Sequence, residues 1–102
     1  MALIDDIRAR FARDEFEFSI HATDQSILRE ISVGELREAM KVGEIIEDYP
    51  DDKYSPSCLI LGLTQSERPI HIHCSYPSRL VVKVITVYEP NSAEWIEFRV
   101  RR

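Results

Sequence analysis

The sequence predicts an α+β domain in which N-terminal helices pack on one face of a curved antiparallel sheet of about four to five strands. Apolar residues recur at helical spacing mainly before Gly43. Beyond that glycine they alternate or form short runs, which is typical of strands. The connections between these runs are short, so neighbouring strands are expected to be antiparallel. A chain of 102 residues is expected to form a single domain over residues 1–102.

Three helices are predicted, over residues 3–12, over residues 21–30 and between Ser32 and Gly43. The first has the apolar spacing of an amphipathic helix. Ser19 is a candidate N-cap for the second helix. Ser32 and Glu35 form the sequence of a capping box, which predicts the start of the third helix, and Gly43 predicts its end.

Strands are predicted over residues 16–20, 44–49, 58–64, 70–76, 80–88 and 95–100. The run over residues 80–88 is the strongest of them because it is rich in Val and Ile. Proline and aspartate predict a loop over residues 50–56, and polar residues with proline predict turns at residues 65–69 and 77–79. The second part of the chain therefore reads as a meander of short-linked strands.

Composition and charge restrict the class of protein. Hydrophobic residues make up 44% of the chain and the mean hydropathy is -0.23, which indicates a globular domain. No apolar run approaches the roughly 18 residues of a membrane span, so no membrane partner is expected. The net charge of -5 disfavours general nucleic-acid binding. The C-terminal half can present a small basic face, but ordinary solubility charge is the better explanation of its residues: Arg79, Lys83, Arg99, Arg101 and Arg102.

The two cysteines, Cys58 and Cys74, lie inside apolar runs that are predicted to be strands. They are too few for the disulfide framework of a small secreted domain. We therefore expect buried free thiols in a reducing compartment, which indicates a cytoplasmic protein.

A series of short motifs runs from about Phe16 to Tyr88. They include Phe18-Ser19-Ile20-His21-Ala22, Leu28-Arg29-Glu30-Ile31-Ser32, Gly43-Glu44-Ile45-Ile46, Tyr49-Pro50, Pro56-Ser57, Leu59-Ile60-Leu61-Gly62, Pro69-Ile70-His71 and Val84-Ile85-Thr86-Val87-Tyr88. In this order they resemble the bacterial family named domain of unknown function 4258. The family pattern has an arginine three residues after His-Ala, where this chain has Gln25. That departure removes one candidate for phosphate binding.

The family is in turn similar to small ribonuclease toxins of the RelE, barnase and colicin type. The resemblance implies a RelE/barnase-like fold and cleavage of RNA without a metal. In several of these toxins a helix His or Lys faces a strand that carries Thr or Ser, one further residue and then Tyr, and Thr86-Val87-Tyr88 has this form. The candidate catalytic residues are His21, Arg29, Thr86 and Tyr88.

Metal-free cleavage of RNA needs a base for the 2′-hydroxyl, an acid for the leaving oxygen and a cation for the phosphorane. His21 suits the acid–base roles, and Arg29 lies eight residues along the same predicted helix on roughly the same face. Tyr88 can donate a proton or orient the phosphate. Each has a structural alternative, since His21 can tie the helix start to a carbonyl and Tyr88 can be a half-buried strand aromatic.

His71 and His73 lie on one face of their predicted strand and, with Lys83, are candidates for substrate binding. In one strand register they share a face with Thr86 and Tyr88. A slip of one residue brings Lys83 to that face instead. The two histidines can share a metal, but no third ligand lies near them in the sequence, so we expect neither a metal nor a cofactor.

Two classes of function follow. The first is a small toxin-like domain that acts as a metal-independent ribonuclease, with RNA as its partner. The second is a non-catalytic interaction module on the same fold that binds an antitoxin-like protein partner, for example through an edge strand that starts at Trp95. The acidic balance and Gln25 favour the second class. A small-molecule pocket lined by His71 and His73 is a third hypothesis.

Overall fold

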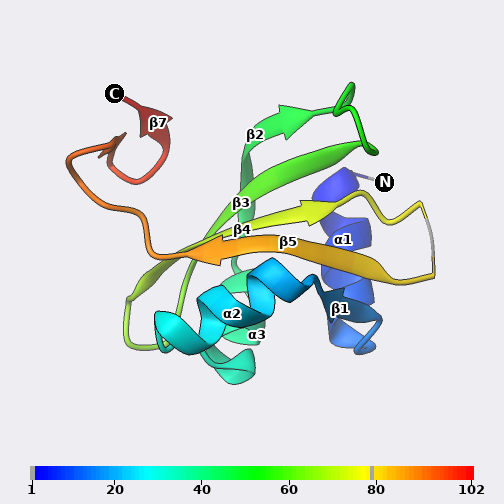
Figure 1. Ribbon diagram of the computed structural model, residues 1–102, viewed down its shortest axis with the longest axis horizontal. Helices are drawn as coiled ribbons and strands as arrows, with labels where there is room; N and C mark the ends of the chain where they lie inside the picture. The colour runs from blue at the N-terminus through cyan, green and yellow to red at the C-terminus, as the bar shows by residue number, and fades with distance from the viewer. Residues whose placement is uncertain (1, 79) are drawn as a thin grey trace.

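The computed structural model describes residues 2–78 and 80–102, and it confirms the α+β class (Figure 1). The helices are α1 (Leu3–Ala12), α2 (Ile20–Leu28) and α3 (Val33–Lys41). The main sheet contains β1 (Phe16–Phe18), β2 (Glu44–Tyr49), β3 (Ser57–Leu63), β4 (Pro69–Ser75) and β5 (Val82–Tyr88), and a separate hairpin contains β6 (Trp95–Ile96) and β7 (Val100–Arg101). Within the described ranges, no helix has the length and apolar character needed to cross a membrane.

Both predicted helix caps are present. Ser19 Oγ accepts the Ala22 N–H at 3.0 Å and caps α2. Ser32 Oγ accepts the Glu35 N–H, and the Glu35 carboxylate accepts the Ser32 N–H in return. This capping box explains why α3 begins directly after Ser32.

The sheet has the order β1-β5-β4-β3-β2. Its strands are antiparallel from β2 to β5, as the short connections predict. The exception is β1, which pairs in parallel with β5, so the sheet is mixed rather than wholly antiparallel. Two helices and three strands separate β1 from β5 in the chain, and the short-connection argument does not apply to such a distant pair.

The helices pack on one face of the sheet and enclose the core with it. Figure 1 shows α2 and α3 on the same side of the sheet. The buried side chains include Ile7, Phe11, Leu36, Met40, Ile60, Ile72 and Val84. α3 lies directly on β3 at Gly62, where a Cβ atom would be 1.9 Å from the carbonyl oxygen of Ala39. Glycine at this position therefore lets the helix backbone approach the sheet closely.

Cys58 and Cys74 are buried free thiols, as expected. They lie opposite each other on β3 and β4, on the face that packs against the helices. A hydrogen bond with Cys58, together with burial, raises the pKa of the Cys74 thiol well above its usual value. The Cys74 thiol is therefore protonated at neutral pH, and both cysteines belong to the core.

The C-terminal segment is not the single strand predicted over residues 95–100. Glu97 and Phe98 have left-handed backbone conformations, with φ values of 50° and 62°, and they fold β7 back on β6. Figure 1 shows this hairpin on the opposite side of the sheet from α2 and α3. The hairpin therefore covers part of the face that the helices leave free.

Candidate active site on the free face of the sheet

The free face of the sheet carries polar side chains together with two leucines, and these residues form two cross-strand rows. One row is Glu47, Leu59, His73 and Thr86, and the other is Leu61, His71 and Tyr88. The strands thus adopt the first of the two predicted registers, in which His71 lies opposite Tyr88 and His73 lies opposite Thr86. Lys83 lies nearer the start of β5, where it pairs with Glu17 of β1. It therefore does not take the place of Thr86 and Tyr88 beside the histidines.

His71 is fully buried and both of its ring nitrogens are hydrogen-bonded. Its Nε2 atom is 2.6 Å from the carbonyl oxygen of Phe98, and its Nδ1 atom is 3.1 Å from the hydroxyl of Tyr88. Burial lowers the pKa of His71 and favours the neutral ring. Because a carbonyl only accepts, Nε2 carries the ring proton and the Tyr88 hydroxyl donates to Nδ1. Trp95 packs edge-on against the same ring, with 4.5 Å between centroids, so His71 anchors the C-terminal hairpin.

His73 is only partly buried and keeps one ring nitrogen available. Its Nε2 atom is 2.9 Å from Ser57 Oγ, and Tyr49 packs edge-on against the ring at 5.6 Å. Among the described residues, Nδ1 has no hydrogen-bond partner. Burial lowers the pKa of His73, although the charge of Asp52 opposes this effect. A neutral imidazole with an available nitrogen is the form that a general base requires.

A charged cluster lies beside Tyr49. Arg101 Nε is 2.9 Å from a carboxylate oxygen of Glu47, and the Tyr49 hydroxyl donates to the same carboxylate. Burial alone would raise the pKa of Glu47, but hydrogen bonds from Tyr49 and Arg101 lower it overall, so Glu47 is ionised at neutral pH. The Arg101 guanidinium stacks over Trp95 at 4.6 Å while its side chain remains 62% exposed. An anion from solvent can therefore reach this cation.

His21 and Arg29 are not joined to this cluster. His21 is exposed on the first turn of α2, and Arg29 follows the last turn, about 12 Å further along the helix axis. Over the part of the chain that the structure describes, neither side chain is hydrogen-bonded or ion-paired to Thr86, Tyr88 or the strand histidines. Burial raises the pKa of Tyr88, and the charge of Arg29 slightly opposes this rise. Thr86 and Tyr88 therefore lie on the free face with the strand histidines, whereas no hydrogen bond among the described residues joins His21 or Arg29 to them.

Gln25, at the position of the missing arginine, contacts the backbone of β5. Its side-chain oxygen accepts the Val87 N–H at 3.1 Å. The pairing of β1 with β5 ends at Val84, so β1 does not reach the Val87 N–H. Gln25 therefore satisfies a backbone donor of the sheet, a task that arginine cannot perform because it has no acceptor.

The basic face considered for the C-terminal half is largely neutralised by acidic partners. The pairs are Arg99 with Glu44, Arg101 with Glu47, and Lys83 with Glu17. Arg102 donates to the backbone carbonyl of Ser92, and Arg79 lies outside the described residues. The charge on this side is therefore a set of local pairs rather than a broad basic surface.

Sequence reasoning did not identify Tyr49, Ser57 or Asp52 as neighbours of His73, or Arg101 as a partner of Tyr49. The sequence places Asp52 only in the predicted loop over residues 50–56, and no motif links any of the four residues to His73. Their proximity arises from the pairing of β2, β3 and β4 and from the fold of the hairpin. Within the described ranges, no three His, Cys, Asp or Glu side chains gather as metal ligands.

The pattern of a family described as Domain of unknown function (DUF4258) matches residues 18–89. The match covers α2, α3 and the strands from β2 to β5. The chain belongs to the DUF4258 family. Comparisons with curated proteins and with solved structures found no match.

The DUF4258 match contains both strand histidines but ends before the C-terminal hairpin. Trp95 and Arg101 therefore come from chain outside the matched region. Trp95 is 4% exposed and packs on His71, and the strand that begins there has only two residues.

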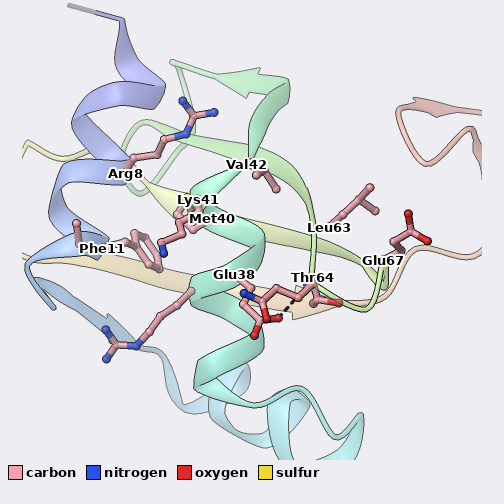
Figure 2. A pocket seen from close by; sticks show the side chains of 12 residues that line it. Arg8, Phe11, Glu38, Met40, Lys41, Val42, Leu63, Thr64 and Glu67 are labelled. Atoms are coloured by element: carbon pink, nitrogen blue, oxygen red, sulfur yellow. Dashed lines mark hydrogen bonds between the residues drawn. The ribbon is translucent and has the colours of Figure 1, made fainter.

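A groove lies on the other side of this DUF4258 chain, between α1, α3 and the turn that joins β3 to β4 (Figure 2). Its volume is about 870 Å³ and much of its lining is apolar. Val42 and Leu63 are exposed along it. Figure 2 shows Arg8 and Lys41 toward one side of the groove and Glu67 toward the other. The groove could not be read from the sequence because its walls come from three separate segments.

Proposed function

We propose that this DUF4258 protein cleaves RNA without a metal, at His73 on the free face of the sheet. The observation that supports this function best is the Nδ1 of His73, which has no partner among the described residues. Tyr49 packs against this ring and is also hydrogen-bonded to Arg101, whose side chain is exposed. Neutral imidazole supplies the base, and the guanidinium supplies the cation.

In the proposed reaction, His73 Nδ1 takes the proton of a ribose 2′-hydroxyl. The 2′-oxygen then attacks phosphorus, and the bond from phosphorus to the 5′-oxygen breaks. The products are a 2′,3′-cyclic phosphate and a 5′-hydroxyl, whose proton comes from water. Arg101 stabilises the added negative charge on the phosphorane, and Thr86, which lies opposite His73, can donate its hydroxyl to a phosphate oxygen.

The proposal keeps the reaction suggested by the resemblance to RelE- and barnase-type toxins, but it moves the base from His21 to His73. Tyr88 is not the proton donor here, because its hydroxyl donates to His71. The pKa of His73 lies below its usual 6.5, so the rate should rise as the pH approaches 6.5 from below and level off above it.

The test is cleavage of a defined RNA by the purified chain in EDTA, with product ends identified. We expect 2′,3′-cyclic phosphate ends from the wild type. His73→Ala should lower the rate at least ~100-fold, the usual contribution of a general base. His21→Ala is the matched control and should cleave at the wild-type rate. Absence of cleavage by the folded wild type, or full activity of His73→Ala, would contradict the proposal.

A second candidate function is binding of a protein partner, and the groove of Figure 2 favours it. Three cations line its helical walls, namely Arg8, Arg37 and Lys41. The partner that fits this surface is an antitoxin-like amphipathic helix with an apolar face and flanking acidic residues. The exposed side chains of Val42 and Leu63 would receive its apolar face.

An NMR titration with designed amphipathic helical peptides tests this second function. A peptide with acidic flanks should shift the amide signals of the groove, and the same peptide with lysine flanks should shift them much less. Leu63→Asp should abolish the response. Leu80→Asp changes a more exposed leucine that does not line the groove, and it should leave the response unchanged. Equal responses to both peptides would exclude the charge-selective partner described here.

A further inference from the structure

Two residues of the matched DUF4258 region are linked by hydrogen bonds to the ring of His73. Asp52 lies in the loop between β2 and β3, and Ser57 is the first residue of β3. Asp52 Oδ2 is 2.6 Å from Ser57 Oγ, which is 2.9 Å from His73 Nε2. Ser57 is fully buried, and the second oxygen of Asp52 accepts the Tyr54 N–H at 3.2 Å. Both oxygens of the carboxylate are therefore held in place.

The number of protons in this chain of hydrogen bonds determines the tautomer of His73. A serine hydroxyl has one hydrogen, and an ionised carboxylate can only accept. The Ser57 hydrogen therefore points to Asp52, and Ser57 Oγ is left as an acceptor toward His73. The hydrogen between Ser57 and His73 must then belong to Nε2. In the neutral ring this leaves the lone pair on Nδ1, the nitrogen without a partner among the described residues.

The same three residues do not form the triad of a serine hydrolase. In such a triad the histidine lies between the acid and the serine and takes the serine proton. Here Ser57 lies between Asp52 and His73, donates its hydrogen to Asp52, and is completely buried. The arrangement orients a histidine and does not activate a serine.

We propose that Asp52 and Ser57 are positioning residues that hold His73 as its Nε2–H tautomer and so present Nδ1 as the base for a ribose 2′-hydroxyl. The catalytic consequence rests on the proposed ribonuclease activity. The tautomer itself does not, and it can be measured in the absence of any substrate.

The experiment is NMR of the full chain with ¹⁵N-labelled histidine at neutral pH. In the wild type we expect a protonated Nε2 and a bare Nδ1 for His73. In Asp52→Asn the amide can donate to Ser57 Oγ, which frees the Ser57 hydrogen for His73 Nε2. The Nδ1–H tautomer should then become populated. Ser57→Ala, which removes the link, should also give a mixture of tautomers.

The matched control is Asp51→Asn, which makes the same change of charge at the neighbouring exposed residue. It should leave the His73 signals unchanged. His71 is an internal reference, because Phe98 and Tyr88 hold its tautomer independently of Asp52. In the cleavage assay Asp52→Asn should lower kcat at least ~10-fold with little change in KM, since a base in the wrong tautomer cannot accept the proton.

The outcomes separate the two proposals. If the His73 tautomer shifts as expected but the wild type does not cleave RNA, the proposed function fails and the tautomer assignment stands. An Nδ1–H tautomer in the wild type would overturn the positioning role. So would an unchanged tautomer in both Asp52→Asn and Ser57→Ala, whether or not the wild type cleaves RNA.

Discussion

At the scale of single residues, hydrogen bonding distinguishes two histidines that look equivalent in the sequence. His71 and His73 lie two residues apart on one strand and point to the same face. His71 uses both ring nitrogens, whereas His73 uses one among the described residues. The difference comes from Phe98 and Trp95, which lie over His71. Of these two histidines, only His73 therefore keeps a ring nitrogen without a partner among the described residues.

Tyr88→Phe tests the structural role of the neighbouring phenol. The change removes the donor to His71 Nδ1 and leaves a buried acceptor unpaired. We expect the free energy of unfolding in urea to fall by about 1–3 kcal/mol. Tyr54→Phe removes the hydroxyl of an 89% exposed tyrosine and should change the free energy of unfolding by less than about 0.5 kcal/mol. An equal effect of the two changes would show that the bond to His71 contributes nothing.

At the scale of elements, the close approach of α3 to β3 depends on one glycine. The backbone of Ala39 occupies the space where a side chain at position 62 would begin. Gly34, on the first turn of the same helix, has no such neighbour, since a Cβ atom there would lie 3.7 Å from Ser32 Oγ. The two glycines therefore have opposite roles, because one allows packing and the other only weakens a helix.

Gly62→Ala and Gly34→Ala should consequently change stability in opposite directions. Gly62→Ala forces α3 away from the sheet and should lower the free energy of unfolding by about 3 kcal/mol or more. Gly34→Ala should raise it by up to about 1 kcal/mol, since alanine loses less backbone entropy in a helix. Chemical denaturation of both variants measures the two effects. A stable Gly62→Ala protein with unchanged unfolding would mean that α3 does not pack as described.

At the scale of the whole molecule, the two strand histidines couple stability to pH. Burial lowers the pKa of both below the usual value of 6.5. As the pH falls below 6.5, the unfolded chain binds protons that the folded chain still excludes, so stability decreases. The charged groups that act on them are Glu47 and Arg101 for His71, and Asp52 for His73. Carboxylates with lowered pKa, such as Glu35, lose their contribution only in a more acidic range, below about 4.5.

We therefore predict that the free energy of unfolding falls as the pH is lowered from 7 to 5. For the fully buried His71, each unit by which the pKa is lowered corresponds to a loss of about 1.4 kcal/mol once the pH is below both pKa values. Urea unfolding at several pH values measures this slope. The double variant His71→Asn, His73→Asn should have a much smaller slope between pH 7 and 5. A slope that persists in the double variant would assign it to other groups.

Much of the fold could be predicted because local signals specify it. The capping box at Ser32 and the alternation along β4 and β5 depend only on residues near one another in the sequence. The parallel pairing of β1 with β5 and the left-handed turn at Glu97 carry no comparable local signal. The candidate site follows the same division. The pairing of His73 with Thr86 was one of two registers left open, whereas the link from Asp52 through Ser57 to His73 was not foreseen.

By itself, the sequence determined the α+β class, the helix starts and the face of β4 on which the two histidines stand. These properties follow from periodicity and capping, which act over a few residues. Only the tertiary structure decided which histidine is open, because that depends on where a hairpin 20 or more residues away lies on the sheet. Our proposal consequently places the base at His73 and not at His21. Burial and hydrogen-bond partners decide the chemistry of an imidazole, and both arise from contacts between distant segments.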